Sequence, residues 1–205
     1  SRNSSLIEVE NQESLENVWN LSEKIDNQHI SLKSGNIFLT NYQTITVTVN
    51  CAGAMGKGIA LVAQHLFPDA YEYYRDLCEK DEMCMGEPVL YDKPSWTLQR
   101  PNKEYIKLLL FPTKQHWKMP GDIVSIEKGL QWLVDNYEKC GIKSLAMPAL
   151  GCGNGGLNWK DIGPLLYKYL GKMNIPVQIY YPPGTPTKYL DEKFLLTEPP
   201  KITDY

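Results

Sequence analysis

Two glycine-rich segments about a hundred residues apart constrain this chain most: Gly53–Gly58 (GAMGKG) and Gly151–Gly156 (GCGNGG). Each follows a run of strand-forming residues and precedes a run with helical spacing. Glycine lets the backbone turn sharply and come close to a ligand. A strand–loop–helix junction also points backbone N–H groups and a helix N-terminus at one place, which favours phosphate. Two such junctions in one small chain predict a clamp on a pyrophosphate.

Neither segment matches a familiar nucleotide motif. A Walker loop needs Gly-Lys-Ser/Thr after a glycine five positions earlier, whereas Gly56-Lys57 is followed by Gly58 and position 51 is a cysteine. The first loop also lacks the G-x-G-x-x-G order of dinucleotide-binding folds, and Gly151-x-Gly153 comes too late in the chain to anchor such a unit. The sequence therefore argues against an NTPase and against a standard NAD-binding domain.

Strands alternate with helices along the chain, which predicts an α/β layered sheet with helices on both faces. In such sheets, ligands bind outside the carboxyl ends of the strands. Both glycine loops lie at such ends, and so does Phe111–Lys114. Asp122 is the predicted N-cap of the longest helix, and Gly141 its left-handed end. The expected strands are 29–32, 44–49, 89–91, 105–111, 142–147 and 177–181, and the expected helices are 13–26, 58–67, one opening at Pro68, 122–140 and 158–170.

Composition narrows the function further. The 205 residues are 42% hydrophobic and carry a formal net charge of −3, which argues against a strongly basic, sequence-blind DNA binder. No run of apolar residues approaches membrane-spanning length, so no membrane partner is expected. The five cysteines form an odd, scattered set without C-x-x-C spacing, which argues against a zinc knuckle or a redox dithiol. Because no secretory segment is recognised either, a reducing, cytoplasmic compartment is expected. No metal or other cofactor is expected, because no His/Cys/Asp cluster has ligand spacing.

Three segments at predicted strand ends carry the most specific signal: Asn50–Ala60 (NCAGAMGKGIA), Phe111–Trp117 (FPTKQHW) and Met147–Trp159 (MPALGCGNGGLNW). Together they closely resemble the macrodomain family, and within it the DarG-type branch of DNA ADP-ribosyl glycohydrolases, which is related to terminal ADP-ribose glycohydrolases. The resemblance implies a three-layer α/β/α macrodomain with a central mixed sheet. It divides the chain into an N-terminal extension with a short helix (1–29), the macrodomain (30–181) and a C-terminal tail (182–205). From the sequence pattern, residues 185–205 are expected to be a tail over the surface or disordered.

The resemblance implies that the two glycine loops wrap the diphosphate and distal ribose of ADP-ribose. Many macrodomains bind the adenine amino group with an aspartate where this chain has Asn36, whose amide oxygen can also accept a hydrogen bond. Cys152 is expected to pack rather than to act as a nucleophile, because no basic partner is evident. The implied ligand-binding residues are Asn36, Ile37, Gly53, Met55, Gly56, Lys57, Gly58, His116, Trp117, Pro148, Gly151, Cys152, Gly153, Asn154, Gly155 and Tyr181.

The resemblance places the catalytic role on Lys114 and Asn50, with the amide of Asn50 near the distal ribose hydroxyls. A lysine partly desolvated in a cleft loses some of its charged character and can act as nucleophile or base. Attack on the anomeric carbon would give a transient lysine–sugar adduct; general acid/base assistance to water is the other route. The alternatives are a solvated surface lysine and a strand-end asparagine that bonds local backbone.

His116 and Trp117 follow the implied catalytic lysine directly. His116 could orient a base or phosphate, because its charge changes near neutral pH, and Trp117 could stack on a thymine or a neighbouring base. Packing under the loop is the alternative for both. Enzymes that release ADP-ribose from glutamate carry an aspartate where this chain has Gly155-Gly156, so the departure favours the DNA-type branch.

The expected function is therefore a glycohydrolase that removes ADP-ribose from a nucleic-acid base, most of all thymine in DNA. The implied partners are ADP-ribose, ADP-ribosylated single-stranded DNA and a cognate ADP-ribosyltransferase, the toxin of an antitoxin pair. Residues 185–205 are too short for the C-terminal region with which DarG-like proteins often block that toxin. Two alternatives stay open: a reader that binds ADP-ribose without hydrolysis, and a hydrolase of protein-linked or small-molecule ADP-ribose derivatives.

Overall fold

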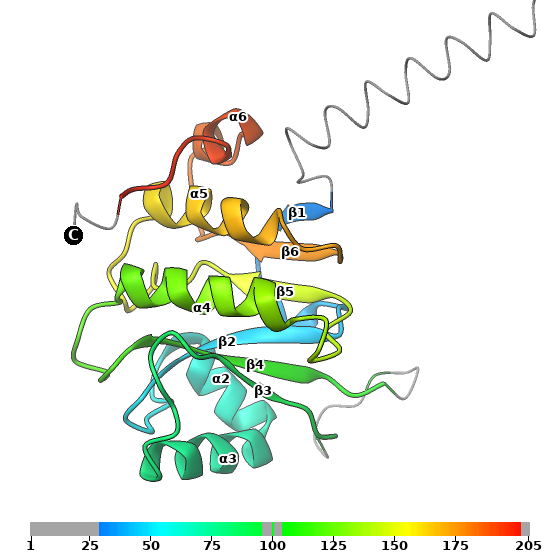
Figure 1. Ribbon diagram of the computed structural model, residues 1–205, viewed down its shortest axis with the longest axis vertical. Coiled ribbons are helices and arrows are strands. Elements are labelled where there is room, and N and C mark those ends of the chain that lie inside the picture. The colour runs from blue at the N-terminus through cyan, green and yellow to red at the C-terminus, as the bar shows by residue number, and fades with distance from the viewer. Residues whose placement is uncertain (1–28, 96–99, 101–103, 202–205) are drawn as a thin grey trace, which may run out of the picture.

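The computed structural model describes residues 29–95, 100 and 104–201, and a six-stranded sheet in the order β1-β6-β5-β2-β4-β3 forms its centre (Figure 1). Neighbouring strands are parallel except for the edge strand β3, which is antiparallel to β4. The mixed sheet expected from the family resemblance is thus confirmed. The strands are β1 (Ile30–Lys33), β2 (Thr44–Asn50), β3 (Val89–Tyr91), β4 (Lys107–Lys114), β5 (Leu145–Pro148) and β6 (Val177–Tyr180).

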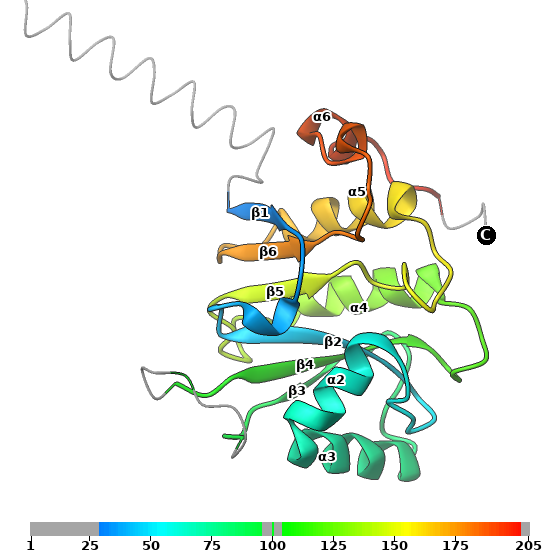
Figure 2. The ribbon, with the colours of Figure 1, turned by 180° about the vertical axis from the view of Figure 1, so that it is seen from behind.

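Helices cover both faces of the sheet, which makes three layers. Helices α4 (Ile123–Asn136) and α5 (Trp159–Leu170) lie on one face, and α2 (Gly58–Leu66) and α3 (Pro68–Glu79) lie on the other (Figures 1 and 2). A strand sends alternate side chains to opposite faces, and β4 shows this directly. Its Leu109 and Phe111 join the core under α4 and α5, whereas Leu108 and Leu110 join the core under α2 and α3. A continuous apolar run is needed here because both faces are buried.

Within the described residues, the predicted elements are found, with shifts at their ends. The side chain of Asp122 accepts hydrogen bonds from the N–H groups of Val124 and Ser125, as an N-cap does. Regular α-helix ends at Asn136, not Cys140. The chain then closes in a Schellman motif, in which Ile142 N–H donates to the Tyr137 carbonyl (3.0 Å) and Gly141 has φ +68°. The strand expected at 105–111 runs from 107 to 114, and the one expected at 142–147 is Leu145–Pro148.

The segment after β6 is not a loose tail between residues 187 and 195, so disorder was the wrong expectation there. It forms a 3₁₀-helix, η2 (Thr187–Tyr189), and a short helix, α6 (Glu192–Leu195). Trp159 Nε1 donates a hydrogen bond to the carbonyl of Tyr189 (2.9 Å), and Leu195 is buried in the core beside α5. Burial of Leu195 supplies apolar stabilisation that holds this segment against α5.

The helix expected at 13–26 lies outside the described residues, and the division into extension, domain and tail stays a prediction. Within residues 29–95, 100 and 104–201, no helix combines the length and apolar character that crossing a bilayer requires.

Candidate functional site

A cavity of about 860 Å³ opens at the carboxyl ends of the parallel strands, where the sequence predicts a ligand. The two glycine loops, the end of β4 and the turn before η1 (Ile37–Leu39) all contribute to its walls. Fifteen of the predicted site residues line it: Asn36, Ile37, Asn50, Gly56, Lys57, Gly58, Lys114, Trp117, Pro148, Gly151, Cys152, Gly153, Asn154, Gly155 and Tyr181.

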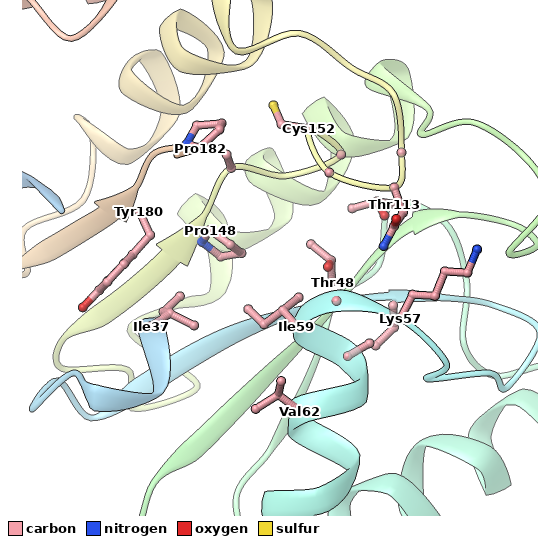
Figure 3. A pocket seen from close by; sticks show the side chains of 18 of the residues that line it. Ile37, Thr48, Lys57, Ile59, Val62, Thr113, Pro148, Cys152, Tyr180 and Pro182 are labelled. Carbon is pink, nitrogen blue, oxygen red and sulfur yellow. The ribbon is translucent and has the colours of Figure 1, made fainter. Parts of the chain in front are cut away.

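One end of the cavity is apolar. Figure 3 shows Ile37, Ile59 and Pro148 gathered across it, with Tyr180 beside them and Val62 on α2 below. Such a surface suits a flat, weakly polar group rather than a charged one. Asn36 stands at the edge of this end and uses its Oδ1 to accept the N–H of Phe38 at 3.0 Å. An amide oxygen has a second lone pair, so it keeps capacity for one more donor.

Asn50, at the end of β2, organises the first glycine loop. Its Oδ1 accepts from Ala52 N–H (2.9 Å), and its Nδ2 donates to the Ala54 carbonyl (2.8 Å). The buried hydroxyl of Tyr74, from α3, donates to the Asn50 carbonyl (2.6 Å) and lies 3.0 Å from its Oδ1. Bonds to the local backbone, the alternative interpretation of Asn50, therefore use most of the hydrogen-bonding capacity of its side chain. One Nδ2 hydrogen is left for a ligand.

The first glycine loop ends at the N-terminus of α2. Gly58 opens the helix with φ +57°, and the N-cap position is held by Lys57 without a side-chain hydrogen bond. In contrast, α4 and α5 are capped by the side chains of Asp122 and Asn158. The first N–H groups of a helix lack partners within it. At α2 they adjoin the cavity with no capping side chain, which suits an anion such as phosphate.

Close packing of its own backbone shapes the second glycine loop. Gly151 has φ +74°, and its carbonyl accepts the N–H of Leu157 at 2.8 Å. A Cβ on Gly155 would lie 2.6 Å from the Gly151 carbonyl oxygen, so only glycine fits there. The carbonyl of Gly155 in turn accepts the N–H of Gly121, from the segment before α4, at 2.8 Å. These bonds hold the loop in one shape beside the cavity.

The two loops and Lys114 meet at the polar end of the cavity. A Cβ on Gly58 would lie 3.3 Å from Asn154 Nδ2, so the first loop faces the second directly. Lys114 pairs with Asn50 in the register of β4 and β2. Its Nζ lies 3.3 Å from the carbonyl oxygen of Trp117 and 3.5 Å from that of Asn154. Lys114 is thus a half-buried side chain between the segment that follows β4 and the second glycine loop, not a freely solvated lysine.

Burial makes two cysteines near the cavity, Cys152 and Cys51, unreactive. Burial raises the pKa of the Cys152 thiol to about 12 and that of Cys51 to about 11. Because the thiolate is the nucleophile, both groups are inert near neutral pH. Cys152 therefore packs in the second loop, as expected. Among the described residues, no group of three His, Cys, Asp or Glu side chains could hold a metal ion.

Three predicted ligand-binding residues are not among those that line the cavity. Gly53 has φ +85° and faces α3, since its Cβ would lie 3.5 Å from that of Cys78. Met55 is 3% exposed and packs in the core under α2 and α3. His116 stacks on Trp117 with 3.6 Å between ring centroids, and its Nδ1 accepts the N–H of Lys118. These contacts fit the alternative of packing within the loop for His116, and its role toward a ligand stays a prediction.

Other lining residues were not predicted as ligand-binding. Thr113 lies near the carboxyl end of β4 and Pro182 comes just after β6, so the rule that sites lie at carboxyl ends could have found them. Ile59 and Val62 lie three residues apart on α2, and an apolar pair at this helical spacing predicts a core position as well as a cavity-lining one. The remaining ones are Gly35, Phe38, Thr48, Val49, Ala54, Ala60, Ala149, Tyr180 and Pro183.

Comparison with known proteins gives a consistent result. The Macro domain family model matches residues 47–165. A DNA ADP-ribosyl transferase-DNA ADP-ribosyl glycohydrolase fusion protein of Thermosipho africanus is 48% identical over 180 residues, which cover 82% of this chain and 46% of that protein. A DNA ADP-ribosyl glycohydrolase of Thermus aquaticus is 35% identical over 153 residues, or 74% of this chain and 41% of that protein. The chain thus spans less than half the length of these relatives.

Solved structures agree with the sequence matches. The structure of Thermosipho africanus DarTG in complex with ADP-ribose has a TM-score of 0.79 at 48% identity, and the match covers 84% of this chain and 47% of that one. The macrodomain of Mycobacterium tuberculosis DarG has a TM-score of 0.68 at 32% identity, over 76% of this chain and 98% of that one.

Proposed function

The chain belongs to the macrodomain family, and we propose that it is a glycohydrolase that removes ADP-ribose from a nucleic-acid base, thymine in DNA above all. The observation that carries the proposal is the meeting of Lys114 with both glycine loops at the polar end of one cavity. The names of its relatives, DNA ADP-ribosyl glycohydrolases, support the choice of DNA as substrate.

The layout of the cavity suits the parts of ADP-ribose in order. The apolar end around Ile37, Pro148 and Tyr180 would hold the adenosine. The diphosphate would lie between the uncapped N-terminus of α2 and the second loop, where backbone N–H groups bind anions. The distal ribose, whose bond to the base is cleaved, would then lie near Lys114.

The hydrogen bonds of Lys114 leave one bonding direction of its Nζ atom free to act on the substrate. Two N–H groups point to the carbonyls of Trp117 and Asn154. An ammonium group has one more N–H, which could protonate the departing base while water attacks the anomeric carbon. A neutral amine instead has its lone pair there and could attack that carbon itself. The base would then leave with the electron pair of its bond and take up a proton, and water would later release the sugar.

The direct test is release of ADP-ribose from a single-stranded oligonucleotide modified on thymine. Lys114→Ala should lower kcat/KM by about 100-fold or more, the usual loss for an acid/base group, whereas calorimetry should show a much smaller change in affinity for free ADP-ribose. Lys143→Ala, an exposed lysine outside the cavity lining, is the matched control. Full activity of Lys114→Ala would remove the catalytic assignment. Borohydride trapping of a protein–sugar adduct would select the covalent route.

A reader that binds ADP-ribose without hydrolysis is the second candidate. It is favoured by Asn50, a predicted catalytic residue whose amide is largely used by its own loop. Binding of ADP-ribose with no release from DNA-, protein- or small-molecule-linked substrates would select the reader. Release from the protein- or small-molecule-linked substrates alone would keep the enzyme and change its substrate.

An ADP-ribosyltransferase is the proposed partner, because the Thermosipho relative joins a DNA ADP-ribosyl transferase to a glycohydrolase in one chain. All five cysteines of this chain are free, which supports a reducing, cytoplasmic-type compartment for the reaction.

A further inference from the structure

The loop between β4 and α4 presents apolar side chains to solvent at the mouth of the cavity. We call residues 115–120 the rim loop. Trp117 and Met119 are each 50% exposed, although large apolar side chains are usually covered. Trp117 also lines the cavity, and its carbonyl oxygen is one of the two that contact Lys114 Nζ. The residue that carries the exposed indole therefore contacts the proposed catalytic group through its backbone.

Several hydrogen bonds fix the shape of the rim loop. Met119 N–H donates to the His116 carbonyl at 3.0 Å, which closes a turn around Trp117. At the base of the loop, Asp122 N–H donates to the Thr113 carbonyl at 2.8 Å, and Gly121 N–H donates to the second glycine loop. The loop is thus held before any ligand binds, so little ordering entropy would be lost on binding.

His116 supports the indole of Trp117. The two rings lie 3.6 Å apart between centroids with 30° between their planes. His116 Nδ1 accepts the N–H of Lys118 at 3.2 Å, which fixes the imidazole in place. Because one ring backs the other, the indole is a preformed platform that is half exposed. An aromatic face of this kind stacks on any nucleobase.

The charge around the platform suits a nucleic-acid strand. From Lys114 to Pro120 the chain carries two lysines and no acidic residue, although its overall formal charge is −3. Lys57, on the first loop, adds a third positive charge at the cavity. Aromatic side chains interleaved with lysines are the usual features of proteins that bind single strands, since bases stack while phosphates meet positive charge.

We propose that the stacked His116–Trp117 pair binds a nucleobase of the modified single strand, next to the thymine whose ADP-ribose lies in the cavity. The inference rests on the proposed function and adds to it that the strand itself is recognised. Trp117 is then a specificity-determining residue. A single strand is the expected form because duplex bases are already stacked on one another and offer no free face.

The test compares two substrates, a thymine-modified oligonucleotide and the ADP-ribosylated thymidine nucleoside, which has no neighbouring base. The unaltered protein should show a higher kcat/KM on the oligonucleotide. Loss of one base–aromatic stack lowers binding by about 5- to 150-fold, so Trp117→Ala should lower the oligonucleotide-to-nucleoside ratio by roughly tenfold. Trp117→Phe should restore most of it, because a smaller aromatic face remains. Leu196→Ala, which removes another exposed apolar side chain (41% exposed) far along the chain, should leave the ratio as it was.

An equal ratio in Trp117→Ala and the unaltered protein would overturn the inference while leaving the glycohydrolase intact. If the unaltered protein released ADP-ribose from neither substrate, the proposed function would fail instead. The platform would then be judged by binding alone: the same ratio, taken from dissociation constants for the modified oligonucleotide and for free ADP-ribose, must still fall about tenfold in Trp117→Ala. A Phe variant as weak as the Ala variant would show that stacking is not the interaction.

Discussion

Two glycines of the second loop offer a matched test of the close packing that shapes the site. A Cβ on Gly155 would lie 2.6 Å from the carbonyl oxygen of Gly151 and 2.9 Å from its Cα. A Cβ on Gly153 would meet nothing within 4 Å. Neither residue has positive φ, so alanine fits the backbone conformation of both. The two substitutions therefore differ in space alone.

The expected loss of stability in Gly155→Ala follows from the atoms that must move to make room for the new Cβ. Both atoms that Gly155→Ala would strike are backbone, so no side chain can rotate away. The loop would have to open, which strains the Leu157-to-Gly151 and Gly121-to-Gly155 hydrogen bonds, both 2.8 Å long. Overpacking of this kind typically costs about 1–3 kcal/mol, or about 2–12 °C in Tm for a chain of this size. Gly153→Ala should change stability by less than about 1 kcal/mol and can even raise it, because the unfolded chain loses freedom.

Urea unfolding measures the loss of stability, and titration calorimetry with ADP-ribose measures any loss of affinity. Gly155→Ala should unfold at lower urea, with an unchanged m-value, and should bind ADP-ribose at least about tenfold more weakly, since a shift of 1.4 kcal/mol suffices for that. Equal unfolding free energies for the two variants would refute the steric reasoning. A destabilised Gly155→Ala with full affinity would show that the loop's shape does not serve the ligand.

Two further predictions concern side chains behind the cavity. Tyr74→Phe removes the hydroxyl that donates to the Asn50 carbonyl. Leaving that buried acceptor unpaired should lower the free energy of unfolding in urea by about 1–3 kcal/mol. A loss no larger than that of Tyr71→Phe, on the same helix, would contradict this prediction. Burial raises the pKa of Cys152 to about 12, so at pH 8 only about one thiol in ten thousand is ionised. Labelling by iodoacetamide, followed by mass spectrometry, should be at least about 100-fold slower in the folded protein than in the urea-unfolded chain and should rise with pH; equal rates would exclude the buried thiol.

Much of the fold could be predicted from the sequence, because its signals are local. Alternation in Thr44–Val49, the apolar run at Tyr105–Phe111 and the N-cap at Asp122 each depend on neighbours along the chain. The ends of elements were less certain, since they depend on pairing. The last three residues of β4, Pro112–Lys114, join the sheet because β2 lies alongside as their partner.

The sequence by itself determined that two glycine loops and Lys114 lie at carboxyl strand ends, since a segment that directly follows a strand lies at that end whatever the order of the strands in the sheet. Only the tertiary structure decided which groups within those loops face the cavity. Met55 turns into the core, and His116 turns under Trp117, although both lie in segments that match the family. A side chain's direction in an irregular loop depends on contacts with residues far along the chain, and no periodicity records those contacts.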